Sequence, residues 1–163
     1  MKLYVGGYGV LDAKLINPFV DAIITILPQL GFKEINRRGL AVKEQVLASQ
    51  GVTVLIGITK GVKGNVAYNM SADTARKVAS TIMMGMPVVE MDEMAQSAIS
   101  EMVNMVTANA AINFEKQGLA VDISPPSIVV GTEYTVRVSN NKYLALSLLV
   151  DSEPIEVNVG LGA

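Results

Sequence analysis

The sequence predicts an α+β fold in which a layer of helices packs on a largely antiparallel sheet. In the first and the longest candidate helices, apolar residues recur at spacings of three and four, as in amphipathic helices. Other runs are rich in Val, Ile, Leu and Tyr and are separated by Gly-containing breaks, which is typical of strands. The order is one helix, three strands, two helices and four strands. A helix followed by strands therefore occurs twice, which hints at an internal duplication without clear residue identity between the halves.

The first half of the chain is expected to hold one helix and three strands. The helix covers residues 12–30, and Pro18 either kinks it or opens its first turn with Asn17 as the cap. The strands are predicted at residues 40–48, 52–59 and 66–70, with tight turns between them at Gly51 and at residues 61–64.

The second half is expected to hold two helices and four strands. Ser71 is a suitable N-cap for a helix that runs to about residue 84, and Gly85 and Pro87 end it. A longer helix covers residues 92–117 and closes at Gly118. Four strands then form a predicted meander with a turn at Asn140-Asn141: residues 127–130, 134–139, 143–150 and 155–159.

Composition and charge exclude several classes of protein. The 163 residues, 50% of them hydrophobic, suit one domain over residues 1–163. A net charge of −2 without a basic run argues against nucleic acid as a partner. The longest charge-free stretch, residues 45–59, is short and partly polar, so no membrane span is expected. Glycines interrupt residues 1–11, which do not read as a signal peptide, so the cytoplasm is the expected compartment.

The chain contains no His and no Cys, which narrows the chemistry further. A Ser-His-Asp or Cys-His centre, a His/Cys zinc site and a disulfide framework are all excluded. No carboxylate cluster at ligand spacing is evident, so no metal site on this chain is expected. Chemistry must come from carboxylates, amides, hydroxyls, Lys or Arg, or be completed by a partner's groups.

The long helix separates into two faces at 100° per residue. One broad face is apolar and is predicted to be the core face: Ala95, Ile99, Met102, Val103, Val106, Ala110 and Phe114. The opposite face is polar and is bordered by apolar residues: Glu90, Ser97, Glu101, Asn104, Ala108 and Glu115, with Met94, Met105 and Ile112 at its border. Polar groups on this face therefore lie among apolar neighbours that point away from the core.

Glu101 and Asn104 are i and i+3 neighbours, so their side chains leave this face side by side. Spacing alone decides nothing, because most polar helix faces of this kind are only solvated. Flexible Met94 and Met105, next to small Ser97 and Ala108, favour a surface that docks to a partner. The methionines are also compatible with a second buried face, and periodicity leaves both interpretations open.

Ser97, Glu101, Asn104 and Pro126 reproduce the motif of the CheC and CheX phosphatases, and most of the chain resembles CheX proteins. Residues 1–11 have no obvious counterpart and are either an N-terminal extension or the result of an uncertain start site. CheC-type members carry the Glu and Asn pair in two helices. Here the first helix offers Asp21 and Ile24 at that spacing, and Ile24 supplies no amide, so the resemblance favours the CheX type.

The resemblance implies an enzyme that hydrolyses the aspartyl phosphate of a CheY-like response regulator and ends a chemotaxis signal. By analogy, Asn104 would orient the attacking water, and Glu101 would form a salt bridge with a lysine of the regulator. The Mg²⁺ ion would come from the regulator, and this chain would bind no cofactor. The resemblance also implies a homodimer formed by joined strands, for which the sparsely charged strands at residues 143–150 and 155–159 are the expected edges.

Two alternatives remain beside this hypothesis: a role in some other two-component pathway, since the motif matches the receiver architecture that such pathways share, and a non-catalytic interaction module. A non-catalytic module that binds a response regulator, related to flagellar switch proteins, would share the fold, and retention of both Glu101 and Asn104 favours the enzyme over it. A phosphate loop at Gly57, Gly61 and Gly64 is disfavoured, because Lys63 precedes Gly64 and no Gly-Lys-Ser/Thr follows a strand. A hairpin turn is the expected structure there.

Overall fold

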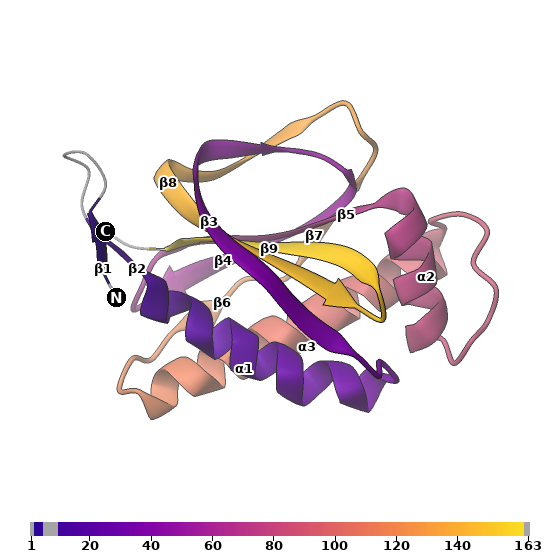
Figure 1. The fold of residues 1–163 in the computed structure, drawn as a ribbon, viewed down its shortest axis with the longest axis horizontal. Helices are drawn as coiled ribbons and strands as arrows, with labels where there is room; N and C mark the ends of the chain where they lie inside the picture. Colours follow the sequence, from indigo (N-terminus) through magenta and orange to yellow (C-terminus); the bar gives the residue numbers. More distant parts are fainter. Residues whose placement is uncertain (1, 5–9, 162–163) are drawn as a thin grey trace.

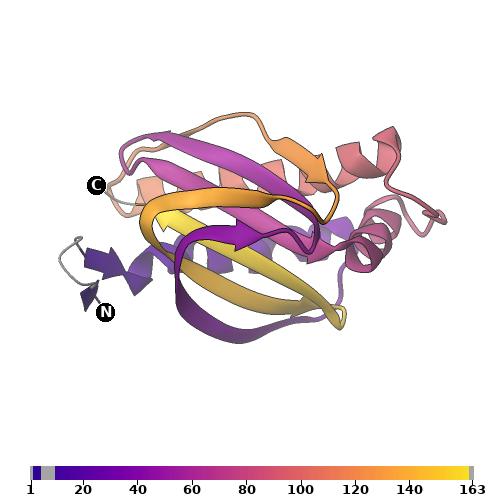
Figure 2. The same cartoon turned by 90° about the horizontal axis from the view of Figure 1, so that it is seen from above.

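The computed structural model describes residues 2–4 and 10–161, with side chains from residue 14 onward. Three helices cover one face of an antiparallel sheet, which confirms the predicted α+β layers: α1 (Asn17–Ile26), α2 (Ala72–Ile82) and α3 (Glu93–Lys116) (Figures 1 and 2). Residues 1 and 5–9 of the predicted N-terminal extension lie outside the described residues. The described parts of that segment belong to a small two-stranded sheet, β1 (Lys2–Tyr4) with β2 (Val10–Asp12).

The main sheet has seven strands: β3 (Ile35–Ala48), β4 (Gly51–Lys60), β5 (Gly64–Ser71), β6 (Asp122–Ile123), β7 (Ser127–Val130), β8 (Thr135–Val150) and β9 (Glu153–Leu161). Their order is β3-β8-β9-β5-β4-β6, and β7 also pairs with β4. Along the path that ends in β7, the strand order is β3-β8-β9-β5-β4-β7. Exchanging β3 with β7, β4 with β8 and β5 with β9 gives the same order read from the opposite edge of the sheet. An internal duplication would produce this symmetry, but residue identity between the halves is lacking, so the duplication stays a prediction.

The first predicted helix is divided into three parts. A 3-10 turn spans Ala13–Ile16, α1 follows, and a second 3-10 turn spans Leu27–Leu30. Pro18 therefore sits in the first turn of α1, where its missing N–H costs nothing, and does not kink the helix. The predicted cap was wrong, because Asn17 is already helical and no side chain caps this end.

The predicted turn at Asn140-Asn141 was also wrong. Both residues lie inside the continuous strand β8. Glu44 pairs with Lys142 and Val46 pairs with Arg137, so residues 138–141 bulge opposite a single residue of β3. An asparagine pair tolerates the backbone of a bulge as well as that of a turn, and the sequence pattern does not distinguish the two.

The last four strands do not form the predicted meander. Only β8 and β9 form a hairpin, while β6 and β7 pair with β4 and β8 also pairs with β3. Consequently β8 and β9 are interior strands, and the expectation that they form free edges was wrong. Their few charges reflect neighbours on both sides, whereas the edges of the described sheet are β3 on one side and β6 with β7 on the other.

Candidate functional site

Helix α3 forms nearly where the sequence predicts it. The Asp92 carboxylate caps the first turn, with Oδ1 accepting a hydrogen bond from the Ala95 backbone N–H at 2.9 Å. Glu93 in the first turn and Lys116 in the last turn both complement the helix dipole. Gly118 follows with a φ of 87°, a left-handed conformation that glycine adopts without strain.

The two faces of α3 are also as predicted. All seven residues of the predicted core face are buried against the sheet and α1. On the opposite face, Ser97 and Glu101 are exposed, while Asn104 and Ala108 are half-buried. Met94 is 62% exposed, which excludes a second buried face at that position, and Met105 packs partly against the core.

The Glu101 carboxylate and the Asn104 amide are both unengaged within the described part of the chain. Neither side chain makes a hydrogen bond or an ion pair with a described residue. One helical turn separates them, so a carboxylate acceptor and an amide that both donates and accepts leave the same face. The structure brings these two predicted catalytic residues together with Ser97 and Ala108 on one outward surface.

A buried hydrogen-bond chain holds this part of α3 on the sheet. The Thr107 hydroxyl donates to the Val103 carbonyl at 2.7 Å and lies 2.7 Å from the hydroxyl of Tyr68 on β5. Because the threonine proton is already engaged, the Tyr68 hydroxyl is the donor to Thr107. Burial raises the pKa of Tyr68, so this donor stays neutral.

Helix α1 packs along α3 and carries an acidic residue, but no amide, at the spacing of the Glu101 and Asn104 pair. The Asn113 amide donates to the Pro18 carbonyl at 2.9 Å, and the rings of Phe19 and Phe114 meet edge to face. Asp21 and Ile24 are both exposed on α1. An amide is missing at the second position, so the paired acid and amide occur on α3 and not on α1.

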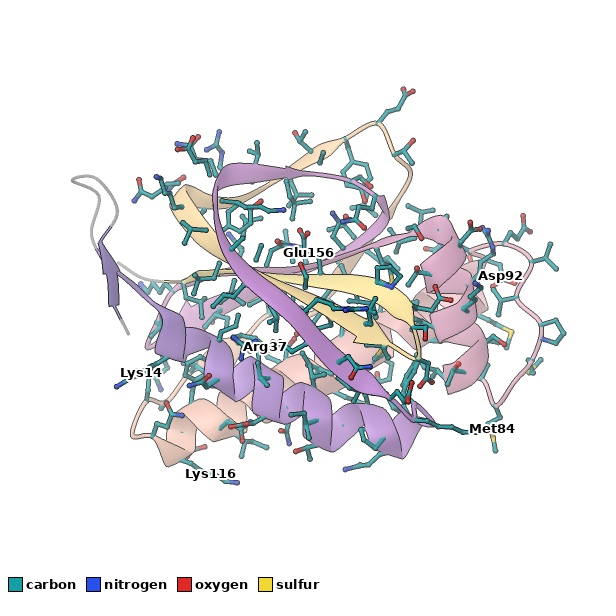
Figure 3. All side chains as sticks on the ribbon, viewed as in Figure 1. Lys14, Arg37, Met84, Asp92, Lys116 and Glu156 are labelled. Atoms are coloured by element: carbon teal, nitrogen blue, oxygen red, sulfur yellow. The ribbon has the colours of Figure 1, made fainter. Side chains whose placement is uncertain are left out.

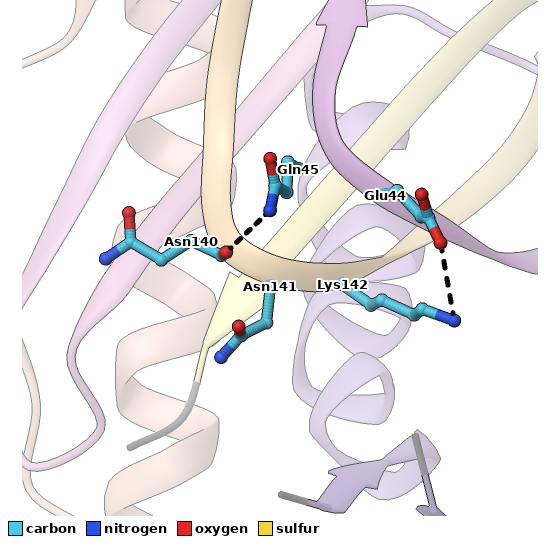
Figure 4. Close-up of a pocket in the computed structure, with 5 residues that line it drawn as sticks. All are labelled: Glu44, Gln45, Asn140, Asn141 and Lys142. Carbon is cyan, nitrogen blue, oxygen red and sulfur yellow. Dashed lines mark hydrogen bonds and ion pairs between the residues drawn. The ribbon is translucent and has the colours of Figure 1, made fainter. Parts of the chain in front are cut away.

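A polar pocket on the β8 bulge is a second candidate site (Figure 4). It has a volume of about 300 Å³, and five residues line it: Glu44, Gln45, Asn140, Asn141 and Lys142. The Gln45 amide donates to the Asn140 carbonyl at 3.0 Å, and Lys142 lies 3.6 Å from the Glu44 carboxylate. These groups largely satisfy one another and close the bulge, so we assign the pocket a structural role.

Within the described residues, no group of three or more His, Cys, Asp or Glu side chains is placed to hold a metal ion. None of the helices in that part of the chain is both long and apolar enough to cross a membrane.

Sequence reasoning missed two features near the site. Tyr68 and Thr107 are far apart in the sequence, so their contact left no local signal. The exposed side chains of Met84, Met86 and Val89, between α2 and α3, were interpreted only as part of a helix end. Their signal is a run of seven uncharged residues, 83–89, that contains several large apolar residues, which a polar loop would not have.

Comparisons with known proteins identify the class of this fold. It is that of the CheC-like proteins, since a CheC-like superfamily protein from a Shewanella species superposes with a TM-score of 0.82 at 21% identity, over 94% of this chain and 100% of that one. The CheX–CheY–BeF₃–Mg²⁺ complex from Borrelia burgdorferi gives a TM-score of 0.73 at 24% identity, over 91% and 98%.

Sequence comparisons identify the family. Residues 52–148, more than half of the chain and including all of α3, match the model of the chemotaxis phosphatase CheX. The protein named CheY-P phosphatase CheX from Thermotoga maritima is 36% identical over 144 residues, which are 88% of this chain and 92% of that protein. This chain therefore belongs to the chemotaxis phosphatase CheX family.

Proposed function

We propose that this chain hydrolyses the aspartyl phosphate of a CheY-like response regulator and so ends a chemotaxis signal. The observation that carries the proposal is the pair on α3, Glu101 and Asn104, which share one outward face and are unengaged by the described residues. Membership in a family of chemotaxis phosphatases supplies the substrate class.

The chemistry requires little from this chain beyond positioning. Water attacks phosphorus, the bond from phosphorus to the aspartyl oxygen breaks, and inorganic phosphate and a free carboxylate result. An acyl phosphate reacts through a loose transition state, so an aligned water and neutralised phosphoryl charge matter more than a covalent nucleophile. A chain without His or Cys can provide this with an amide.

We assign Asn104 to the attacking water, which its amide would hold in line with the breaking bond. Glu101 would pair with a lysine beside the phosphorylated aspartate and keep the two proteins in register. Met94, Ser97, Met105 and Ala108 would form the contact surface around them. Mg²⁺ would be supplied by the regulator, in line with its presence in the Borrelia complex.

Three further properties are proposed with this function. The chain acts as one domain over residues 1–163, with residues 1–11 as an extension. It works in the cytoplasm, where a chemotaxis response regulator would be met. It forms a homodimer, for which β3 is an available edge strand.

The test is the lifetime of the phosphoryl group on a CheY-like regulator from the same organism, with and without this chain. Faster phosphate release with Mg²⁺ present supports the enzyme. Binding that leaves the lifetime unchanged would instead identify the non-catalytic module.

A further inference from the structure

The loop between α2 and α3 exposes an uncommon amount of apolar surface. We call residues 83–91 the methionine loop, and its first seven residues carry no charge. Met84 is 96% exposed, Val89 is 87% exposed and Met86 is 54% exposed. Val88 and Met91 from the same loop pack against the core. The loop is thus anchored from inside while three large apolar side chains face solvent.

Hydrogen bonds hold both ends of the methionine loop. At the end of α2, the Gly85 N–H donates to the Ser80 carbonyl at 2.8 Å and the Met84 N–H donates to the Thr81 carbonyl at 3.2 Å. These are the two bonds of a Schellman motif with Met84 in its left-handed position. At the start of α3, the Gln96 side chain donates to the Met91 carbonyl at 2.7 Å. The apolar side chains are therefore presented by a tethered backbone and do not result from a frayed end.

Met84 combines exposure with backbone strain. Its φ is 59°, in the left-handed region that disfavours side chains with a Cβ. A glycine would adopt this conformation freely, as the neighbouring Gly85 does at 88°. Strain and exposure are both unfavourable in the free chain, and such a combination is typical of a residue retained for contact with a partner.

The methionine loop continues the proposed site on α3. It leads directly into the first turn of α3, where Met94 is 62% exposed. Met94 precedes Glu101 by seven residues, so the two side chains point within about 20° of each other around the helix axis. The loop projects beyond the N-terminal end of α3, and Met84 points away from the molecule (Figures 2 and 3).

We infer that the methionine loop is a second docking contact for the CheY-like regulator, packing on uncharged apolar surface beside the phosphorylated aspartate. This inference rests on the proposed function. The loop leads directly into the helix face that carries Met94 and Glu101. A regulator that covers this face would therefore also contact the adjoining loop, and for this reason we select the regulator as the partner of the loop. Flexible thioethers adapt to such a surface at little cost. The loop thus contributes affinity, while Asn104 contributes the chemical step.

The test compares two sets of substitutions at constant fold. Met84→Gln, Met86→Gln and Val89→Thr together keep side-chain size and remove apolar character. We expect the Kd for a CheY-like regulator loaded with beryllofluoride and Mg²⁺, and the KM for phosphate release, to rise about tenfold with kcat unchanged. The control is Val129→Thr with Val130→Thr, which removes exposed apolar groups on β7 and should leave both constants unchanged.

Met84→Gly separates docking from folding. Relief of the left-handed strain should raise the melting temperature, while loss of the side chain raises KM. An unchanged Kd and KM in the triple variant would overturn the inference. A changed sedimentation coefficient with an unchanged Kd would also overturn it, since the loop would then contact a second copy of this chain. If the wild type binds without hydrolysis, the proposed function fails, and the Kd comparison still decides on the loop.

Discussion

The hydroxyl of Tyr68 on β5 lies 2.7 Å from the hydroxyl of Thr107 on α3, one helical turn beyond Asn104. The Thr107 hydroxyl in turn donates a hydrogen bond to the carbonyl of Val103, the residue before Asn104. The bond is buried and fixes both the rotation of α3 and its position along the sheet. Because Asn104 would have to align a water molecule, we regard Tyr68 as a positioning residue for the proposed reaction.

Tyr68→Phe should therefore lower kcat about threefold to tenfold while KM stays unchanged, because the helix still docks but its amide is less well aligned. The free energy of unfolding should fall by about 1 kcal/mol through the lost hydrogen bond. Steady-state kinetics with a phosphorylated regulator and urea unfolding measure the two effects. Thr107→Ser keeps the hydroxyl and should retain most of kcat, whereas Thr107→Val should behave like Tyr68→Phe. A loss of stability without a change in kcat would reduce Tyr68 to a structural role.

The raised pKa of Tyr68 predicts how stability depends on alkaline pH. Burial favours the neutral phenol in the folded chain, and the ordinary pKa of 10.0 applies when the chain is unfolded. The stabilisation is therefore fully present below pH 10 and is lost as pH rises toward the folded pKa. Above pH 10, Tyr68 should account for a loss of about 1.4 kcal/mol per pH unit. Urea unfolding between pH 8 and 11 should show a shallower decline for Tyr68→Phe than for the wild type, and equal declines would be inconsistent with the assignment.

Glu101→Ala should weaken docking more than chemistry, because a lysine of the regulator would lose its charged partner in an interface poor in water. We expect the Kd for a beryllofluoride-loaded regulator to rise about 30-fold, equivalent to about 2 kcal/mol. Glu133→Ala removes the same charge from an exposed position outside the proposed site and serves as the control. If turnover collapses while the Kd stays at the wild-type value, the docking role of Glu101 is wrong.

The homodimer prediction now concerns β3 and no longer β8 or β9. Sedimentation equilibrium at micromolar concentration should give twice the chain mass of 17.3 kDa. Val42 is exposed on β3, and Val42→Lys would place like charges near one another across a two-fold pair of edges, so it should favour the monomer. A wild-type chain that sediments only at 17.3 kDa would rule out the dimer.

The sequence predicted α3 well because its signals are local. The spacing of the core residues and Gly118 act within a few residues of the helix, so its extent and its faces followed from the pattern. The spacing of Glu101 and Asn104 did not by itself distinguish a functional pair from a solvated helix face, and resemblance to the motif of the CheC and CheX phosphatases singled the pair out. The methionine loop, which we propose as part of the partner surface, was not predicted, because it belongs to no periodic element.

Strand order could not be predicted in the same way. The low charge of residues 143–150 and 155–159 is compatible with an unprotected edge and with an interior strand, and only pairing across the sheet distinguishes the two. Similarly, Thr107 reads as an ordinary position on an apolar helix face until β5 brings Tyr68 to it. Contacts of long sequence separation therefore account for most of what the pattern missed.

Phosphate release by Asn104→Ala tests most directly the proposed role of the Asn104 amide, which is to align the attacking water. The measurement is single-turnover phosphate release from a phosphorylated CheY-like regulator, with Gln117→Ala, at the C-cap directly after α3, as the matched amide control. We predict a fall of about 100-fold in the release rate, with an unchanged Kd for the beryllofluoride-loaded regulator, because the water loses its alignment while the docking surface is intact. Phosphate release at the wild-type rate from Asn104→Ala would contradict the account.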